Sequence, residues 1–110
     1  MSIRKVVNNS HVSARSYMQK LNGGTLTFGQ MLESLRLSEE ISQAEFAKKL
    51  GISKSHLCDI EKGRKNVGPS RAAHFAKILK QSPAVFLEIA LEDLLKKEGL
   101  DYKLSLAANF

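Results

Sequence analysis

Apolar residues recur along most of the chain at the three- and four-residue spacing of an α-helix. Most of these segments begin near Ser or Pro, and Gly often follows them, as at the ends of helices. No segment between residues 25 and 99 resembles a strand. The pattern therefore predicts an all-α domain of five short helices, at about residues 28–40, 43–50, 54–62, 69–81 and 83–98.

The two ends of the chain show weaker patterns than the middle. Residues 1–9 are basic and lack periodicity, and residues 10–22 could form one additional short helix capped by Ser10. After Gly99 apolar and polar residues alternate briefly, as in a short strand or a frayed end. We therefore predict three regions: a basic N-terminal segment at 1–24, a helical domain at 25–91, and the end of the last helix with the tail at 92–110.

Capping residues predict a tight turn between the second and third helices. Ser42 and Glu45 have the spacing of a capping box, in which each side chain bonds the backbone N–H of the other residue. We expect Gly51 to end this helix in the left-handed conformation and Ser53 to cap the next helix. Ala47 is expected to be small because the two helices cross there.

Composition limits the class of protein. The 110 residues suffice for one small domain, and because only 6% are aromatic we expect an aliphatic core. Cys58 has no second cysteine with which to form a disulfide, which suits a reducing compartment. No apolar run reaches the ~18 residues of a membrane span, and the start of the chain lacks the apolar region of a secretory signal. We therefore expect a cytoplasmic protein that has no membrane contact.

The positive charge is distributed unevenly. The chain carries a net charge of +6, while residues 83–110 contain three Lys/Arg against five Asp/Glu. A basic body with an acidic end favours an oriented contact with a polyanion, although a generic basic soluble protein is the alternative.

The segment "GISKSHLCDIEKG", residues 51–63, contains the residue types of an active site. At ~100° per residue, however, His56 and Cys58 lie ~200° apart around a helix, so they cannot bind one metal or act as base and nucleophile. We predict no enzyme, no metal and no cofactor. Leu57 and Ile60 would instead face the core, and the opposite face, with Ser55 and Asp59, would be polar enough to enter a DNA major groove.

The residues from "FGQMLESLR" through "ISQAEFAKKLGISKSHLCDIEKG" resemble the helix-turn-helix domain of Cro and phage-repressor type regulators, the XRE family. The resemblance covers about residues 27–91, with the motif at about 43–62. It implies a five-helix, lambda-repressor-like fold in a DNA-binding transcription regulator, expected to be a dimeric repressor of bacterial, phage or plasmid origin. The expected partner is double-stranded DNA with a two-fold symmetric operator.

The resemblance also implies roles for individual residues. Gln43 corresponds to a phosphate contact at a helix N-terminus, and Lys54 and Ser55 correspond to positions that contact bases. Asp59 could accept a hydrogen bond from cytosine, or could pair locally with Lys62. Glutamine or arginine is common at position 54 in the family, and an acid at position 59 is unusual. Arg64, Lys65 and Asn66 lie just past the helix predicted at 54–62 and correspond to contacts with the DNA phosphate backbone. The full predicted DNA-binding set is Gln43, Ser53, Lys54, Ser55, Asp59, Lys62, Arg64, Lys65 and Asn66.

Two further predictions concern structure and assembly. The resemblance implies a partly buried ion pair between Arg36 and Glu61, which would join the first and third helices. The last helix carries more apolar surface than one core needs, so we expect it to form a homodimer interface; a single wide apolar face on a monomer is the alternative. The predicted interface residues are Phe86, Leu87, Ala90, Leu91, Leu94 and Leu95.

A different class of function remains open at this level. Small proteins that contain this domain also serve as antitoxins that bind a toxin and regulate their own operon. The basic N-terminal segment or the tail "DYKLSLAANF" could then hold the toxin. A controller of a restriction–modification operon is a further alternative.

Overall fold

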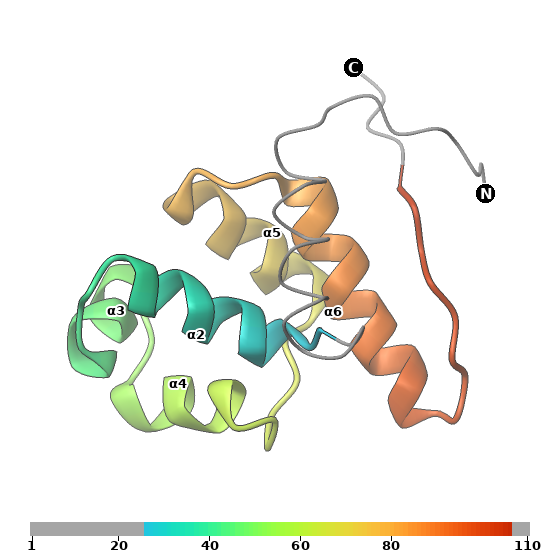
Figure 1. The fold of residues 1–110 in the computed structure, drawn as a ribbon, viewed down its shortest axis with the longest axis horizontal. Coiled ribbons are helices and arrows are strands. Elements are labelled where there is room, and N and C mark those ends of the chain that lie inside the picture. The colour runs from blue at the N-terminus through green and yellow to red at the C-terminus, as the bar shows by residue number, and fades with distance from the viewer. Residues whose placement is uncertain (1–25, 107–110) are drawn as a thin grey trace.

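The computed structural model describes residues 26–106, and within them every regular element is a helix. Figure 1 shows α2, α3 and α4 gathered on one side of the molecule, with α5 above α2 and α6 on the other side. The predicted all-α architecture of five helices is confirmed, whereas the short helix expected at 10–22 lies outside the described residues. The bounds are α2 Phe28–Ser38, α3 Gln43–Leu50, α4 Lys54–Glu61, α5 Pro69–Leu79 and α6 Pro83–Lys97.

The predicted capping residues define the turn between α3 and α4. The Ser42 hydroxyl accepts a hydrogen bond from the Glu45 backbone N–H at 3.1 Å, and the Glu45 carboxylate accepts one from the Ser42 N–H at 3.4 Å. Gly51 follows α3 with φ of 77°, a conformation in which a side chain is strained. Ser53 then caps α4 by accepting from the His56 N–H at 3.0 Å. Local sequence therefore determines where both helices begin and where α3 ends.

Most of the buried hydrophobic residues are aliphatic, as expected, and Phe28, Phe46, Phe75 and Phe86 lie among them. The ring centroids of Phe28 and Phe86 lie 5.5 Å apart in an edge-to-face arrangement with an interplanar angle of 87°. The aromatic residues are few, but each buries a large apolar area, so their location matters more than their number. The largest fully buried side chains are Phe46, Phe75, Phe86, Leu32, Leu57, Ile60 and Ile89.

The backbones of α2 and α4 approach each other closely at Gly29. A Cβ atom built on Gly29 would collide with the backbone carbonyl of Ile60, so only glycine fits at this crossing. Ala47, the small residue expected at a helix crossing, is also buried, at 1% exposure. These small residues let α2 and α3 support α4 from two sides.

The tail after α6 is neither a strand nor a frayed end in its described part. Residues 101–106 have no regular secondary structure and return alongside α6, as Figure 1 shows. The Leu104 N–H donates to the Glu92 carboxylate at 2.6 Å, and the Leu106 N–H donates to the Glu88 carboxylate at 2.7 Å. Alternate residues of an extended segment thus meet carboxylates one helical turn apart.

Candidate nucleic-acid interface

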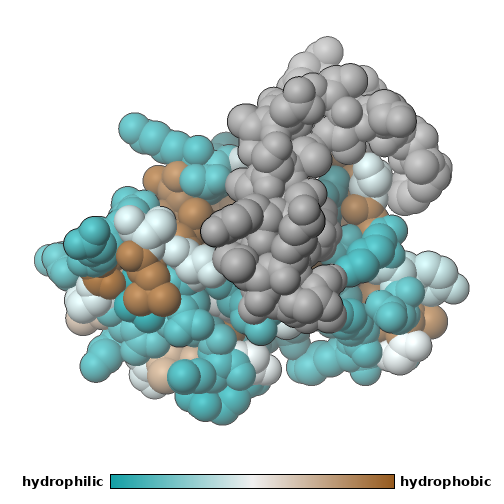
Figure 2. Space-filling model, viewed as in Figure 1, coloured by the Kyte–Doolittle hydropathy of each residue, from teal (hydrophilic) through white to brown (hydrophobic). Residues whose placement is uncertain are grey.

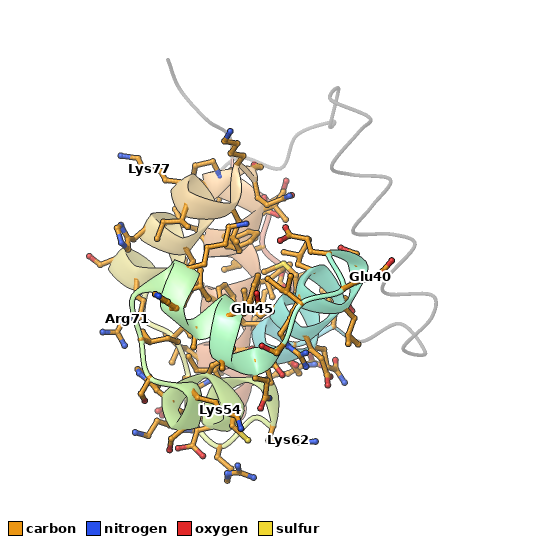
Figure 3. All side chains as sticks on the ribbon, turned by 90° about the vertical axis from the view of Figure 1, so that its left-hand side faces the viewer. Glu40, Glu45, Lys54, Lys62, Arg71 and Lys77 are labelled. Carbon is orange, nitrogen blue, oxygen red and sulfur yellow. The ribbon has the colours of Figure 1, made fainter. Side chains whose placement is uncertain are left out.

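The α4 helix lies between a buried face and an exposed one. Leu57 and Ile60 are 0% and 1% exposed and pack in the core. Lys54 and Lys62 lie at the two ends of the same helix, and Figure 3 shows both side chains pointing away from the body of the molecule. The exposed side of α4 is therefore polar and accessible, as a helix that enters a groove requires.

Glu61, at the end of α4, connects three helices through its carboxylate. Arg36 of α2 donates to Glu61 through Nε at 2.9 Å and Nη2 at 3.1 Å, a bidentate ion pair. Gln43 of α3 donates to Glu61 Oε1 through Nε2 at 2.8 Å. The hydrogen bond with Glu61 is the main reason that the pKa of Arg36 lies above its ordinary value. The network fixes the orientation of α4 relative to α2 and α3.

Gln43 thereby has a structural contact in addition to the phosphate contact predicted for it. One of its two amide hydrogens bonds Glu61, and an amide carries a second hydrogen that can donate to another acceptor. The side chain is half-buried at the first turn of α3, where the backbone N–H groups of a helix favour an anion. The contact with Glu61 would hold the amide of Gln43 in place for such a role.

Three exposed predicted site residues lie at the N-terminal end of α4. The hydroxyl oxygen of Ser53 is occupied by the cap of α4, while its O–H group can still donate. Lys54 and Ser55 follow and are exposed. The structure therefore brings these three side chains to one edge of the molecule, next to the N-terminus of α4.

The alternative pairing of Asp59 with Lys62 is wrong, because the neighbour that binds Asp59 is Arg64. Arg64 Nε donates to Asp59 Oδ1 at 2.9 Å, and Arg64 Nη2 lies 3.5 Å from the Cys58 sulfur. Asp59 is the main reason that the pKa of Arg64 is raised. Arg64 can reach Asp59 because the chain turns back at Gly63, which has φ of 79°.

Arg71 was not among the predicted site residues, but it adds a further cation beside α4. Arg71 of α5 approaches the ring of His56, with Nη1 3.4 Å from Nε2. Burial lowers the pKa of His56, and the charges of Arg71 and Lys65 lower it further. Figure 3 shows Arg71 pointing outward above Lys54. The only local signal was a basic residue in the first turn of α5.

The α6 residues predicted to form a dimer interface do not share one surface. Phe86 and Ala90 belong to the core of the single chain, at 2% and 1% exposure, so their assignment to an interface is wrong. Leu87, Leu91, Leu94 and Leu95 remain partly exposed. Figure 2 shows a largely hydrophilic surface interrupted by separate hydrophobic patches. A hollow of about 400 Å³ is lined by Leu91, Leu94, Leu95, Lys97, Glu98 and Leu104.

Neither a cluster of metal ligands nor a membrane-spanning helix is found among residues 26–106. Between residues 26 and 106, no three His, Cys, Asp or Glu side chains come together as metal ligands would. None of the helices in that range is long and apolar enough to cross a bilayer. Asn66, the remaining predicted phosphate contact, is half-buried in the loop that leads from α4 to α5.

Comparison with known proteins agrees with this geometry. Residues 32–86 match a family model described as helix-turn-helix. The chain is 33% identical over 77 residues to the immunity repressor protein of Bacillus phage phi105, an alignment that covers 70% of this chain and 52% of that protein. The chain thus spans about half the length of that relative. No solved structure gives a significant match. The chain belongs to the helix-turn-helix family of the Cro and phage-repressor type and contains its DNA-binding domain.

Proposed function

We propose that the protein is a sequence-specific transcriptional repressor that binds its operator as a dimer, with α4 in the major groove. The observation that carries this proposal is the attachment of α4: Glu61 joins it to Arg36 and Gln43, while Lys54 and Ser55 stay exposed. A helix held in one orientation can present its side chains to base edges at fixed positions. The similarity to a phage immunity repressor supports repression as the outcome.

The charged residues around α4 support a division of roles. Lys54 and Ser55 would contact bases, since they lie on the first turn of a helix that is exposed on that side. Phosphate contacts would come from cations, amides and a hydroxyl group around α4, because such contacts orient a protein on the duplex without specifying sequence. The residues proposed for this second role are Gln43, Ser53, Lys62, Lys65, Asn66 and Arg71.

Dimerisation would use the partly exposed leucines of α6. The hollow between Leu91, Leu95 and Leu104 is apolar and lies outside the core of the single chain. A second copy of this face would cover it, and a two-fold dimer matches an operator whose half-sites lie about 34 Å apart, one helical turn. The acidic carboxyl-terminal part of the chain would then lie away from the DNA phosphates.

Selection from a pool of random DNA duplexes tests the proposal. We expect the protein to enrich a two-fold symmetric motif, and the affinity for that motif to fall steeply with salt concentration as phosphate contacts are screened. Replacing Lys54→Ala should remove the preference at one position of each half-site, at a cost of about 1–3 kcal/mol for the preferred base. No enriched motif, or binding that is insensitive to salt, would contradict the function.

A further inference from the structure

Asp59 and Arg64 form an ion pair on the exposed side of α4, and the two side chains differ in accessibility. Arg64 Nε lies 2.9 Å from Asp59 Oδ1, and the side chains are 59% exposed for Arg64 and 29% for Asp59. The carboxylate is therefore the more covered member of the pair, and the guanidinium is the member that a macromolecule approaching α4 can reach.

Backbone hydrogen bonds fix the segment that carries Arg64. The N–H groups of Arg64 and Lys65 both donate to the Asp59 carbonyl oxygen, at 2.8 and 3.2 Å. Arg64 Nη2 also lies 3.5 Å from the sulfur of Cys58. Arg64 is thus held against the last turn of α4 through both its backbone and its side chain. A long side chain restricted in this way loses less conformational entropy when it binds.

The contacts leave one edge of the guanidinium available. An arginine has five N–H donors in a rigid fork. Asp59 uses the Nε hydrogen and Cys58 faces one Nη2 hydrogen, so Nη1 and the second Nη2 hydrogen remain for another acceptor. These two outer nitrogens can donate side by side to O6 and N7 of guanine. The ion pair also offsets the negative charge of Asp59. Without Arg64, the Asp59 carboxylate near DNA would repel phosphate.

The inference rests on the proposed function and deepens it. We infer that Arg64, oriented by Asp59, contacts a guanine in the major groove next to the end of α4, and that Asp59 is a positioning residue and does not contact cytosine directly. Arg64 then contributes to sequence preference, in place of the phosphate contact that the position alone suggested. Asp59 contributes by neutralising and orienting the guanidinium.

The test compares two variants and one control variant on the motif that the wild-type protein selects. Arg64→Met keeps much of the side-chain volume but removes the donors, and we expect it to abolish one guanine preference per half-site. Asp59→Ala leaves the arginine free, so we expect the same guanine to stay preferred, but more weakly. Lys62→Met, an exposed cation on the same turn, is the matched control and should weaken binding to all sequences alike. Circular dichroism establishes that each variant is folded.

A modified base separates the two possible contacts within one G·C pair. Guanine is replaced by 7-deazaguanine, which retains O6 and base pairing but lacks the N7 acceptor. We expect wild-type affinity to fall about 10-fold, the effect of losing one hydrogen bond to a charged group. Arg64→Met should show no further loss with this base, since its donors are already absent.

The outcomes distinguish this inference from the proposed function. If the Arg64→Met variant still prefers the guanine, the inference is wrong but the proposed function is not. The same holds if the Asp59→Ala variant loses the guanine preference completely. Uniform weakening by Arg64→Met with a shallower salt dependence makes Arg64 a phosphate contact and also overturns the inference. Absence of any wild-type motif overturns the function and the inference together.

Discussion

At the scale of single residues, Glu61 shows how one buried carboxylate positions a surface helix. Its side chain is 0% exposed, and that of its partner Arg36 is 12% exposed. Burial of such a pair is costly, but three hydrogen bonds from Arg36 and Gln43 satisfy the carboxylate. The same residue therefore affects both the stability of the fold and the placement of α4.

Removal of this carboxylate is expected to destabilise the protein strongly. Glu61→Ala leaves the charge of Arg36 partly buried without its partner, and we expect the free energy of unfolding to fall by about 3–5 kcal/mol. Lys49→Ala is the control, because the Lys49–Glu39 pair is 43% and 40% exposed and should contribute less than about 1 kcal/mol. Urea unfolding measures both changes. Equal losses in the free energy of unfolding would show that the buried pair stabilises the fold no more than the exposed one.

A second residue-scale expectation concerns acid. Asp93 is half-buried and accepts a hydrogen bond from the Phe28 N–H at 2.8 Å, and burial raises its pKa above the ordinary 3.8 despite that bond. A folded-state pKa above the unfolded one means that the folded protein binds more protons, so this group's contribution to stability falls as pH rises above 3.8. Asp93→Asn can still accept from Phe28 but does not titrate.

The difference in stability between the wild type and Asp93→Asn isolates the effect of the titration of Asp93. We expect the stability of Asp93→Asn relative to wild type to increase with pH from about pH 3 until the folded-state pKa has been passed, and then to level off. Thermal unfolding over a pH series measures the difference. A relative stability that falls with rising pH would mean that the hydrogen bond from Phe28 outweighs burial.

At the scale of elements, the crossing of α2 and α4 decides how far the exposed helix stands from the core. Gly29 permits the contact with the Ile60 carbonyl, and the Glu61 network lies one residue further along α4. Hydrophobic spacing predicted both helices but could not show that their backbones touch. The sequence alone does not show whether a glycine in a helix marks a close crossing, because that depends on which element packs against it.

Substitution at the crossing should affect stability and DNA binding together. Gly29→Ala forces α2 and α4 apart, and we expect a loss of about 1–3 kcal/mol in the free energy of unfolding, as for overpacked cores. Operator affinity should also fall, because α4 moves. Gly68→Ala is the matched control: it meets no atom within 4 Å and should change stability by less than about 0.5 kcal/mol. An equal effect of both variants would rule out the crossing as the cause.

At the scale of the whole molecule, the described residues divide into a cationic side around α4 and an apolar hollow beside α6. Lys54, Lys65 and Arg71 lie on the first, and Leu91, Leu95 and Leu104 line the second. The tail closes against α6 through Glu88 and Glu92, so it contributes Leu104 to the hollow. The proposed dimer would thus depend on a segment that follows the last helix.

Charge placed in the hollow should separate the subunits. We expect Leu91→Arg to shift the protein from dimer to monomer in sedimentation equilibrium, and to weaken binding to a two-fold operator more than to a single half-site. Leu37→Arg is the control, since Leu37 is 58% exposed on α2. A wild-type protein that sediments as a monomer at all concentrations would contradict the proposed interface.

Local patterns along the chain predicted the five helices, the capping box at Ser42, the left-handed Gly51 and the family resemblance, because each depends on residues a few positions apart. Contacts between distant positions could not be predicted from such patterns. The packing of the helices placed Phe86 in the core and joined Asp93 to Phe28, 65 residues away. Helical periodicity specifies which residues share a face, but only the packing of helices specifies what that face meets.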